Sequence, residues 1–266
     1  MPTSRLRHLL RIVYVTAIAE FKLKYQDSAL GYIWSLAKPL ALFSMLYIVF
    51  GRFFGFNGDP YYGVRLLIGI VLWFFFLDAT VVGMASISAR GPLLRKLAFP
   101  RLTIPISVTV SSAMTLSVNA LAVAVFLAWK RIVPSLDWLL VLPLLVELYV
   151  FVLGVALILG TIYVFFKDVS QVWDLVLQLL FYASPLLYPP RFLPSWFRPL
   201  TFLNPLVQVT EDLRHILVPP YPGWFTAGQV YGHGAGELIP IAVAFATLGF
   251  GLLLFRRLSP RIPERV

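Results

Sequence analysis

Four ionisable side chains lie within long apolar stretches of this 266-residue chain: Lys38, Asp78, Glu147 and Asp174. A charged group inside a membrane usually marks a substrate or ion pathway, so these four are the first candidates for chemistry. Their spacing forms no recognisable proton relay. For Lys38, two interpretations remain open. It attracts an anionic head group, or it extends to the lipid headgroups beside a kink at Pro39.

Motifs for catalysis or metal binding do not occur in the sequence. Its three histidines do not form an HExxH motif, and there is no GxSxG motif and no cysteine. The adjacent carboxylates Glu211 and Asp212 point to different faces of a helix. The chain also lacks GxxxxGK[ST], so it cannot hold nucleotide phosphates by that route. We therefore expect no catalytic residue, no metal site and no bound cofactor.

The composition explains which elements must carry these residues. The chain is 59% hydrophobic and 13% charged, with a mean hydropathy of +0.84. A soluble domain carries about a quarter charged residues, so this composition indicates an integral membrane protein. The net charge of +10 would suggest nucleic acid in a soluble protein, but here it reflects membrane topology, and we expect no nucleic-acid partner.

Six stretches are apolar and long enough for membrane helices: 30–50, 64–86, 102–128, 138–166, 172–188 and 238–255. The side that holds both termini carries about twice as many Lys and Arg residues as the other, which predicts cytoplasmic termini. The fold class is thus an all-α membrane protein with six transmembrane helices in a single domain. Residues 29–188 contain spans one to five, residues 238–256 contain span six, and residues 257–266 form a cytoplasmic tail.

The N-terminal segment, residues 1–28, has apolar residues at helical spacing with Arg7 and Arg11 on another face. This pattern predicts an amphipathic interface helix on the cytoplasmic membrane surface. The alternative is a cleavable signal peptide, since Ala17-Ile18-Ala19 has the small-x-small form.

Between spans five and six, residues 189–237 are apolar yet rich in proline. Irregular backbone at membrane depth requires cover by protein or a cavity. We expect a re-entrant helical hairpin at the outer mouth of a pathway, and an ordinary outer loop is the alternative.

The loop between spans two and three contains a short predicted helix. Pro92 can start it and Pro100 ends it, with Leu93, Leu94 and Leu97 on one face. Because so short a helix rarely persists alone in water, docking on a partner is expected. A basic loop that serves topology alone is the other interpretation.

Four motifs resemble permease subunits of bacterial polysaccharide ABC exporters, which carry O-antigen, capsule, teichoic acid or galactan. The first, which we call the first-span motif, runs from Lys24-Tyr25 through Ser28, Gly31 and Trp34 to Pro39 and includes Lys38. The second is Arg95-Lys96-Leu97-Ala98-Phe99-Pro100-Arg101. The third is Lys167-Asp168, where the family usually has Arg-Asp. The fourth comprises Tyr182, Ser184, Pro185, Tyr188, Asn204, Pro205 and Arg214.

The resemblance implies a homodimer bound to two copies of a separate nucleotide-binding ATPase, which holds the ATP and Mg²⁺. It implies export of a lipid-linked glycan across the bacterial inner membrane, through a channel between the two permeases, with membrane lipids around them. The ATPase-coupling residues would be Pro92, Leu93, Leu94, Arg95, Lys96, Leu97, Phe99, Arg101, Lys167 and Asp168. The interface helix would contribute Arg7, Arg11, Lys22, Lys24 and Tyr25.

The fourth motif would belong to the gate and channel. Three other functions remain open at this point. They are a drug efflux permease of the same superfamily, a membrane-embedded polyprenyl-phosphate glycosyltransferase, and an ion-coupled carrier. The last two are disfavoured by the lack of a catalytic set and of an internal repeat.

Overall fold

The computed structural model describes residues 2–26, 31, 33–90, 101–232 and 234–264. Within these ranges every regular element is a helix, which confirms the all-α fold class. The short helix expected at 92–99 and residue Ser28 lie outside the described residues.

Five helical segments are long and apolar enough to cross a membrane within the described part of the chain. They are α2 (Ile33–Ile48) with the π-turn η1 (Val49–Phe53), α3 (Tyr62–Ala89), α5 (Thr103–Trp129), η3 (Leu136–Leu140) with α6 (Val141–Phe165), and α11 (Leu238–Leu258) with part of η6 (Ser259–Glu264).

The sixth apolar helix, α7 (Val169–Ala183), is shorter than the predicted span at 172–188. Its 15 residues extend over about 22 Å, whereas the hydrocarbon core of a bilayer is about 30 Å thick. The helix stops because Pro185 forces an extended conformation on the residue before it, and Ser184 has φ −83° and ψ 142°. The six-span count therefore stays a prediction.

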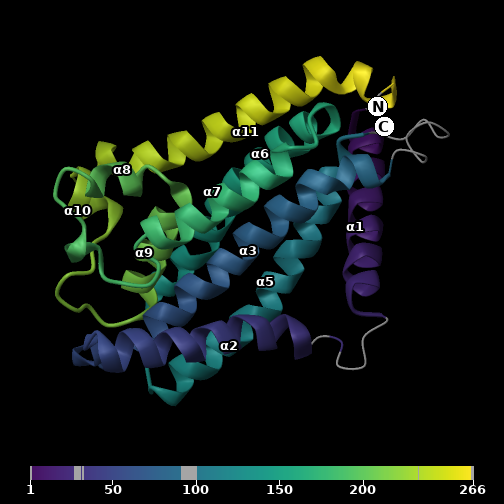
Figure 1. The fold of residues 1–266 in the computed structure, drawn as a ribbon. Coiled ribbons are helices and arrows are strands. Elements are labelled where there is room, and N and C mark those ends of the chain that lie inside the picture. The colour runs from purple at the N-terminus through teal and green to yellow at the C-terminus, as the bar shows by residue number, and fades with distance from the viewer. Residues whose placement is uncertain (1, 27–30, 32, 91–100, 233, 265–266) are drawn as a thin grey trace.

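Helix α3 is the centre of the bundle and is buried on nearly all its faces (Figure 1). It packs against α5 and α6, and α6 in turn packs against α11. The α6–α11 contact is close because it is built on glycines. A Cβ atom at Gly154 would lie 2.6 Å from the backbone nitrogen of Leu248, and one at Gly251 would lie 2.7 Å from the carbonyl of Gly154. Small residues of this kind let membrane helices approach backbone to backbone.

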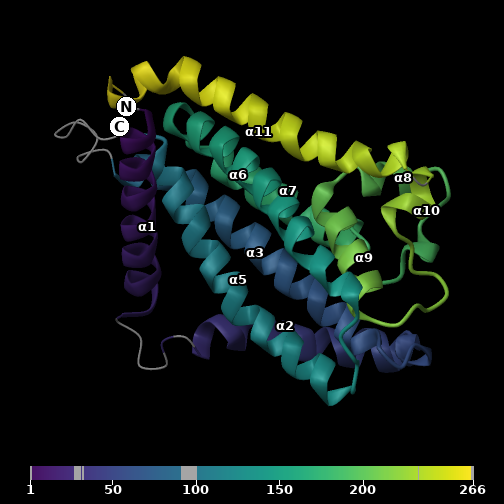
Figure 2. The same ribbon diagram turned by 180° about the vertical axis from the view of Figure 1, so that it is seen from behind.

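Helix α1 (Pro2–Gln26) runs across the direction of the bundle helices and packs on α5 (Figures 1 and 2). Among its apolar residues, Ala17 is buried and Leu10 is 60% exposed. The helix itself is confirmed. Its position on a membrane surface stays a prediction.

Both termini lie at one end of the bundle (Figure 1). At this end Arg90 forms an ion pair with Glu20, and Arg101 donates a hydrogen bond to the carbonyl of Ser259. Lys167 Nζ also donates to Ser88 Oγ at 2.7 Å. These contacts bring together α1, the end of α3, the start of α5, the α6–α7 turn and the end of α11. The cytoplasmic side of this end stays a prediction.

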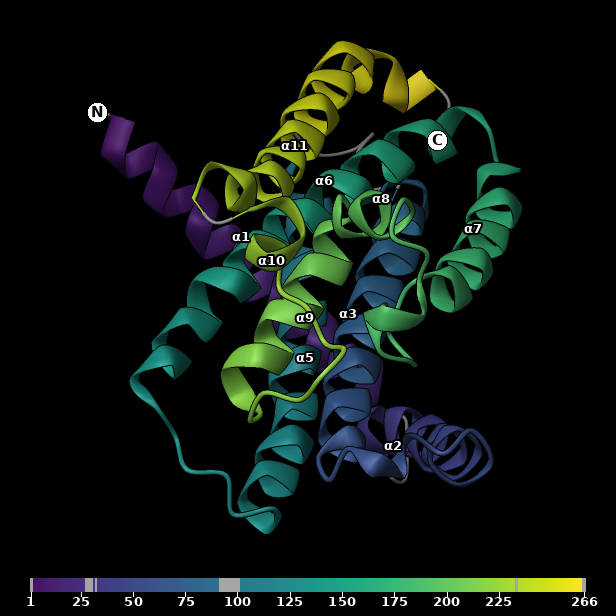
Figure 3. The same cartoon turned by 90° about the vertical axis from the view of Figure 1, so that its left-hand side faces the viewer.

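The opposite end holds the short elements between α7 and α11 (Figure 3). They are η4 (Pro190–Phe192), α8 (Arg198–Phe202), α9 (Pro205–Leu217), α10 (Ala227–Tyr231) and η5 (Ala235–Glu237). Phe202, Val207 and Ala227 form a small apolar core of their own. The segment is thus a packed helical cap, and its re-entrant character stays a prediction.

Candidate functional site

A cavity of about 280 Å³ lies where α1, α2, α3 and α5 meet, and we call it the inner pocket. Helix α2 contributes four residues to its lining and α3 contributes four more. The lining residues are Lys24, Gly31, Trp34, Ser35, Lys38, Pro39, Phe74, Phe75, Leu77, Asp78, Ser112, Thr115, Leu116 and Asn119. The structure thereby gathers most of the first-span motif around one cavity.

An ion pair ties α1 to α3 at this pocket. Lys24 Nζ lies 2.7 Å from both carboxylate oxygens of Asp78, and Ser112 Oγ donates to the second of these oxygens at 2.7 Å. The two charged side chains are 36% and 23% exposed. The pair is only partly buried and lines the inner pocket, so water or a ligand in this pocket can reach it. The pair can therefore exchange its partner for a bound group.

The other pocket residues offer a mixed surface. Lys38 is exposed, Trp34 is half exposed, and Phe74 and Phe75 add aromatic faces. The amide oxygen of Asn119 is buried and accepts no hydrogen bond from any described residue. Ammonium groups attract anions, while aromatic faces beside hydroxyls and amides suit an amphipathic ligand. The pocket can accommodate a small anionic, hydroxyl-bearing group.

Part of this pocket escaped the sequence analysis. Asp78 was a candidate without a partner, because Lys24 lies 54 residues earlier in the chain. Ser112, Thr115 and Asn119 were not considered, although their spacing of three and four residues marks one face of an apolar helix. A polar stripe on a membrane helix is the signal that finds them.

The residues expected to couple to an ATPase are described only in part. Residues 92–99, including Arg95 and Lys96, lie outside the described residues. Arg101 and Lys167 lie at the end of the bundle that holds the termini, and Asp168 is exposed there. Lys167 also sits 4.2 Å from the ring centroid of Tyr163. Their coupling role stays a prediction.

On the interface helix, Arg7, Arg11 and Lys22 are exposed, as expected for its basic face. Tyr25 belongs to the helix, but its side chain is outside the described part of the structure. Lys24 differs from the other basic residues because it turns inward to Asp78.

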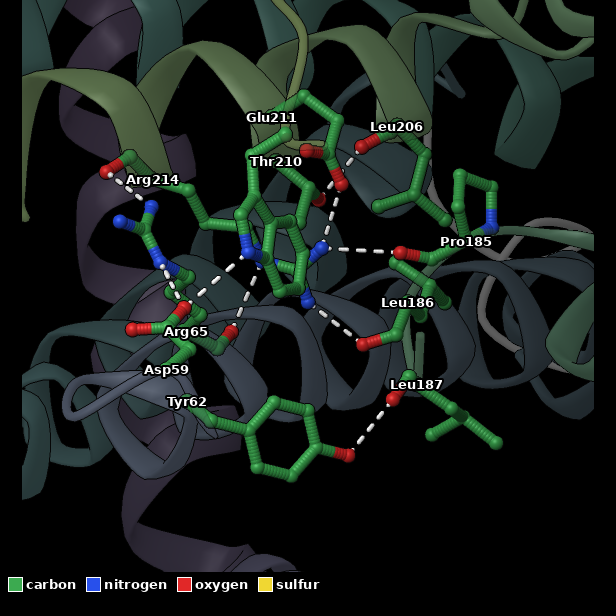
Figure 4. A network of polar contacts seen from close by, with 11 residues as sticks. Asp59, Tyr62, Arg65, Pro185, Leu186, Leu187, Leu206, Thr210, Glu211 and Arg214 are labelled. Carbon is green, nitrogen blue, oxygen red and sulfur yellow. Dashed lines mark hydrogen bonds and ion pairs between the residues drawn. The ribbon is translucent and has the colours of Figure 1, made fainter. Parts of the chain in front are cut away.

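A second polar cluster lies at the start of α3, and we call it the buried cluster: Asp59, Arg65, Glu211, Arg214 and Trp224 (Figure 4). Arg214 has no exposed side-chain surface. Its guanidinium donates to the carbonyls of Arg65 at 2.9 Å, Pro185 at 2.9 Å and Leu186 at 2.5 Å, and to Glu211 Oε1 at 2.5 Å.

Arg65 completes this cluster. Its Nε donates to Asp59 Oδ2 at 2.9 Å, and Trp224 Nε1 donates to the same oxygen at 3.1 Å. The guanidiniums of Arg65 and Arg214 lie 5.2 Å and 4.8 Å from the Trp224 ring. Burial raises the pKa of Glu211 to about 7 in spite of Arg214, and no described residue bonds its second oxygen.

In this arrangement Arg214 stabilises the structure. It holds the carbonyls that follow α7 against α3 and α9, and nearby Tyr62 donates from its hydroxyl to the carbonyl of Leu187 at 2.7 Å. The chain thus uses the cluster to fix the segment after α7. A channel-lining role for Arg214, Ser184 and Pro185, which are all buried here, stays a prediction.

The remaining gate candidates divide into two groups. Asn204 caps α9 by accepting from the backbone N–H of Leu206 at 3.0 Å, with Pro205 as the first helical residue. Tyr188 donates to the carbonyl of Tyr182 at 3.2 Å, close to the end of α7, while the side chain of Tyr182 is 69% exposed. Only Tyr182 of this group presents an open surface.

Helix α7 also carries a polar stripe that the sequence analysis did not identify. Gln171, Asp174, Gln178 and Tyr182 are all exposed and follow helical spacing on one face. Polar side chains that face lipid are costly, so a face of this kind normally meets protein or a water-filled space. The stripe is therefore a candidate surface for a conduit or a second chain.

These features define a multi-pass helical membrane protein that carries a polar pocket and a polar exposed stripe within its apolar bundle, which is typical of transporters. Residues 12–218 match the ABC-2 type transporter family, and the chain belongs to that family.

Its similarity to individual transport proteins extends along almost the whole chain. An O-antigen export system permease protein RfbA from Klebsiella pneumoniae is 30% identical over 214 residues, which are 80% of this chain and 82% of the relative. A second protein of that name and organism is 28% identical over 265 residues, covering 97% of this chain and 96% of its own. The polysialic acid transport protein KpsM from Escherichia coli is 25% identical over 248 residues, or 90% of each chain.

Proposed function

We propose that this chain is the membrane-spanning permease of an ATP-driven exporter that moves a lipid-linked polysaccharide across the bacterial inner membrane. The observation that carries the proposal is the alignment of 97% of the chain with an O-antigen export permease. A relative named for polysialic acid transport supports a polysaccharide cargo rather than a drug. O-antigen, capsule and teichoic acid are all cargoes of the proposed class.

The inner pocket is the proposed contact site for the anionic head of the cargo. Lys24 and Lys38 would attract a phosphate group, and the aromatic ring of Trp34 can stack on a sugar. The Lys24–Asp78 pair joins α1 to this pocket. Movement of α1 would therefore change the charge that the pocket presents.

A second copy of the chain would complete the pathway. The polar stripe of α7 (Gln171, Asp174, Gln178 and Tyr182) lies exposed on a helix that is otherwise apolar. In a homodimer, two such stripes could face each other across a water-filled channel. This arrangement would remove the cost of placing polar groups against lipid.

Energy would come from two copies of a separate ATPase subunit, which would hold ATP and Mg²⁺. The chain itself has no GxxxxGK[ST] motif. The ATPase would dock at the end of the bundle that holds both termini, on the cytoplasmic side, through α1 and the segment at 92–99. Arg101, Lys167 and Asp168 lie at that end.

Co-purification from the native membrane tests this proposal. A Walker-motif ATPase should accompany the chain at a one-to-one ratio, and ATP turnover should require the complex. Deleting the permease should leave lipid-linked polysaccharide inside the cell. A chain that purifies without an ATPase, together with normal surface polysaccharide in the deletion strain, would contradict the proposal.

The docking step has its own test. Reversing the charges of Arg95 and Lys96, or placing proline at Leu94, should abolish stimulated ATP turnover while the protein still inserts in the membrane. Normal stimulation of ATP turnover in these variants would show that these residues do not couple to the ATPase. It would not contradict the proposed transport function.

A further inference from the structure

A cavity of about 940 Å³ opens between α6, α9, α10 and α11. Helices α9 and α10 lie at the end of the bundle opposite the termini (Figure 1). The cavity is separate from the inner pocket and from the buried cluster. One wall is apolar and comes from the membrane-spanning helices, with Leu142 and Val146 on α6 and Ile241 and Phe245 on α11. Leu142, Val146 and Phe245 are also exposed on the outside of the bundle, so this wall continues into the surface that meets lipid.

The other wall consists of hydrogen-bond acceptors. Glu147 is 7% exposed and Gln208 is 3% exposed, and both line the cavity. Neither Glu147 Oε1 nor Gln208 Oε1 has a hydrogen-bond partner among the described residues. Buried acceptors are satisfied in the great majority of native proteins, so each of these oxygens requires a donor.

Two further carboxyl groups line this wall. Asp212 lines it too, and its two oxygens already accept from Gln208 Nε2 at 2.7 Å and from the backbone N–H of Ala227 at 3.0 Å. Glu237 lies on the same cavity. A ligand that brings N–H donors would satisfy the unpaired oxygens of Glu147 and Gln208, and a positive charge on it would pair with the carboxyl groups.

Few ligands can both donate hydrogen bonds to the acceptor wall and cover the apolar wall. No set of three His, Cys, Asp or Glu residues in the described ranges could hold a metal ion. A metal ion would also leave the apolar wall without a function. A lipid with a primary ammonium in its headgroup fits both walls. The ammonium can donate three hydrogen bonds, and the acyl chains cover apolar surface.

We propose that this cavity binds a membrane phospholipid whose headgroup carries a primary ammonium. The ammonium donates to Glu147 and to the amide oxygen of Gln208. The phosphate lies at the mouth of the cavity, where His215 and Thr226 can donate to it. One acyl chain runs along Val146 and Ile241. The site is independent of the proposed export cargo.

Native mass spectrometry of the full-length chain tests this site. The delipidated protein is titrated with phosphatidylethanolamine, phosphatidylcholine and phosphatidylglycerol that have identical acyl chains. Phosphatidylcholine keeps the positive charge but has no N–H donor. We expect the first phosphatidylethanolamine to bind about tenfold more tightly than either other lipid, the difference typical of one charge-assisted hydrogen bond.

Three variants locate the binding. Glu147→Gln combined with Asp212→Asn should reduce phosphatidylethanolamine binding to the level of phosphatidylcholine. Ile241→Trp fills the apolar wall and leaves every carboxylate in place, and it should weaken binding of phosphatidylethanolamine by a similar factor. Asp137→Asn is the matched control, because Asp137 is an exposed acid close to α6 but outside the cavity. It should bind as the unmodified chain does.

Two results would overturn the proposal. The first is equal binding of the three lipids by the unmodified chain. The second is stoichiometric Mg²⁺ binding that Ile241→Trp leaves unchanged and the double acid variant removes, since that would make the cavity a site for an inorganic cation.

Discussion

Helix α3 carries one polar cluster at its start and a second just past its middle, and both are built around ion pairs. The buried cluster centres on Arg65 and Arg214, and the inner pocket centres on Asp78 and Lys24. In the first, the arginine side chains are at most 1% exposed and their hydrogen bonds reach five backbone carbonyls. In the second, the charged pair is partly exposed and borders a cavity.

The difference separates structure from function. A fully buried charge is tolerated only while every partner stays in place, so the buried cluster fixes one conformation. A partly exposed pair gains little from its partner and can exchange it for water or for a ligand. We therefore infer that the buried cluster stabilises the fold and that the inner pocket makes the contacts that change during transport.

Removing the centre of the buried cluster should have the largest effect. Arg214→Met removes the guanidinium partner of the buried Glu211 carboxyl and the side-chain donor to three backbone carbonyls. Breaking a buried pair in this way costs about 3–5 kcal/mol, which is a large part of a typical folding free energy. We expect little monodisperse protein on size-exclusion chromatography in detergent.

Arg191→Met is the control for that variant, because Arg191 lies in the same outer segment with its side chain exposed. A normal yield of the Arg214 variant would contradict the structural role of the buried cluster.

Charge exchange in the inner pocket should leave the fold intact and change transport. Lys24→Asp alone places two carboxylates together and should abolish export, while Lys24→Asp with Asp78→Lys restores the pair and should recover it. The unfolding free energy should change by less than about 1 kcal/mol in the double variant. Surface polysaccharide in whole cells and the melting temperature of the purified protein measure the two quantities. If export failed equally in the single and double variants, a direct link between α1 and α3 would be wrong.

The two clusters also differ in how far the sequence could predict them. The first-span motif converges on one pocket partly because Trp34 and Lys38 lie four residues apart on α2 and so share one face of that helix. Pairing of Lys24 with Asp78, or of Arg65 with Arg214, depends on tertiary packing across 54 and 149 residues. Local spacing contains no information on such pairs.

The ends of two helices show how much local sequence determines. Asn204-Pro205 marks the start of α9, as a cap followed by a first-turn proline, although the sequence analysis took these residues only for part of a gate. The end of α7 was placed too late, although Pro185 marks it, because the apolar run continues through Leu186 and Leu187. Those two leucines lie outside any helix and belong to the main hydrophobic core.

The stability of the folded protein should depend on pH through Glu211 of the buried cluster. Burial raises its pKa to about 7, above the value near 4.3 of an unfolded glutamate. The folded protein therefore keeps this proton over a pH range in which the unfolded chain has lost it. The stabilisation is complete below about pH 4 and is lost as the pH rises to 7.

Melting temperatures between pH 5 and pH 7 measure this effect, and they should fall as the pH rises. Glu211→Gln should flatten the dependence. A melting temperature of the unmodified chain that rises over the same range would show that Glu211 is ionised throughout.

A small effect is expected at the end of α7. Tyr188→Phe removes the hydroxyl that donates to the carbonyls of Tyr182 and Ala183, which should cost about 0.5–1 kcal/mol. Tyr182→Phe is the matched control, since the Tyr182 side chain is mainly exposed and its loss should not change stability. Equal melting temperatures for both variants would mean that the Tyr188 bond contributes nothing to the end of this helix.

The most direct test of the contrast between the two clusters is Asp78→Asn, with export and melting temperature measured on the same preparation. This change removes one charge and almost no volume, and Ser112 can still donate to the remaining oxygen. We predict export at background level with a melting temperature within about 4 °C of the unmodified protein. Normal export, or loss of the folded protein, would contradict a transport role for the inner pocket.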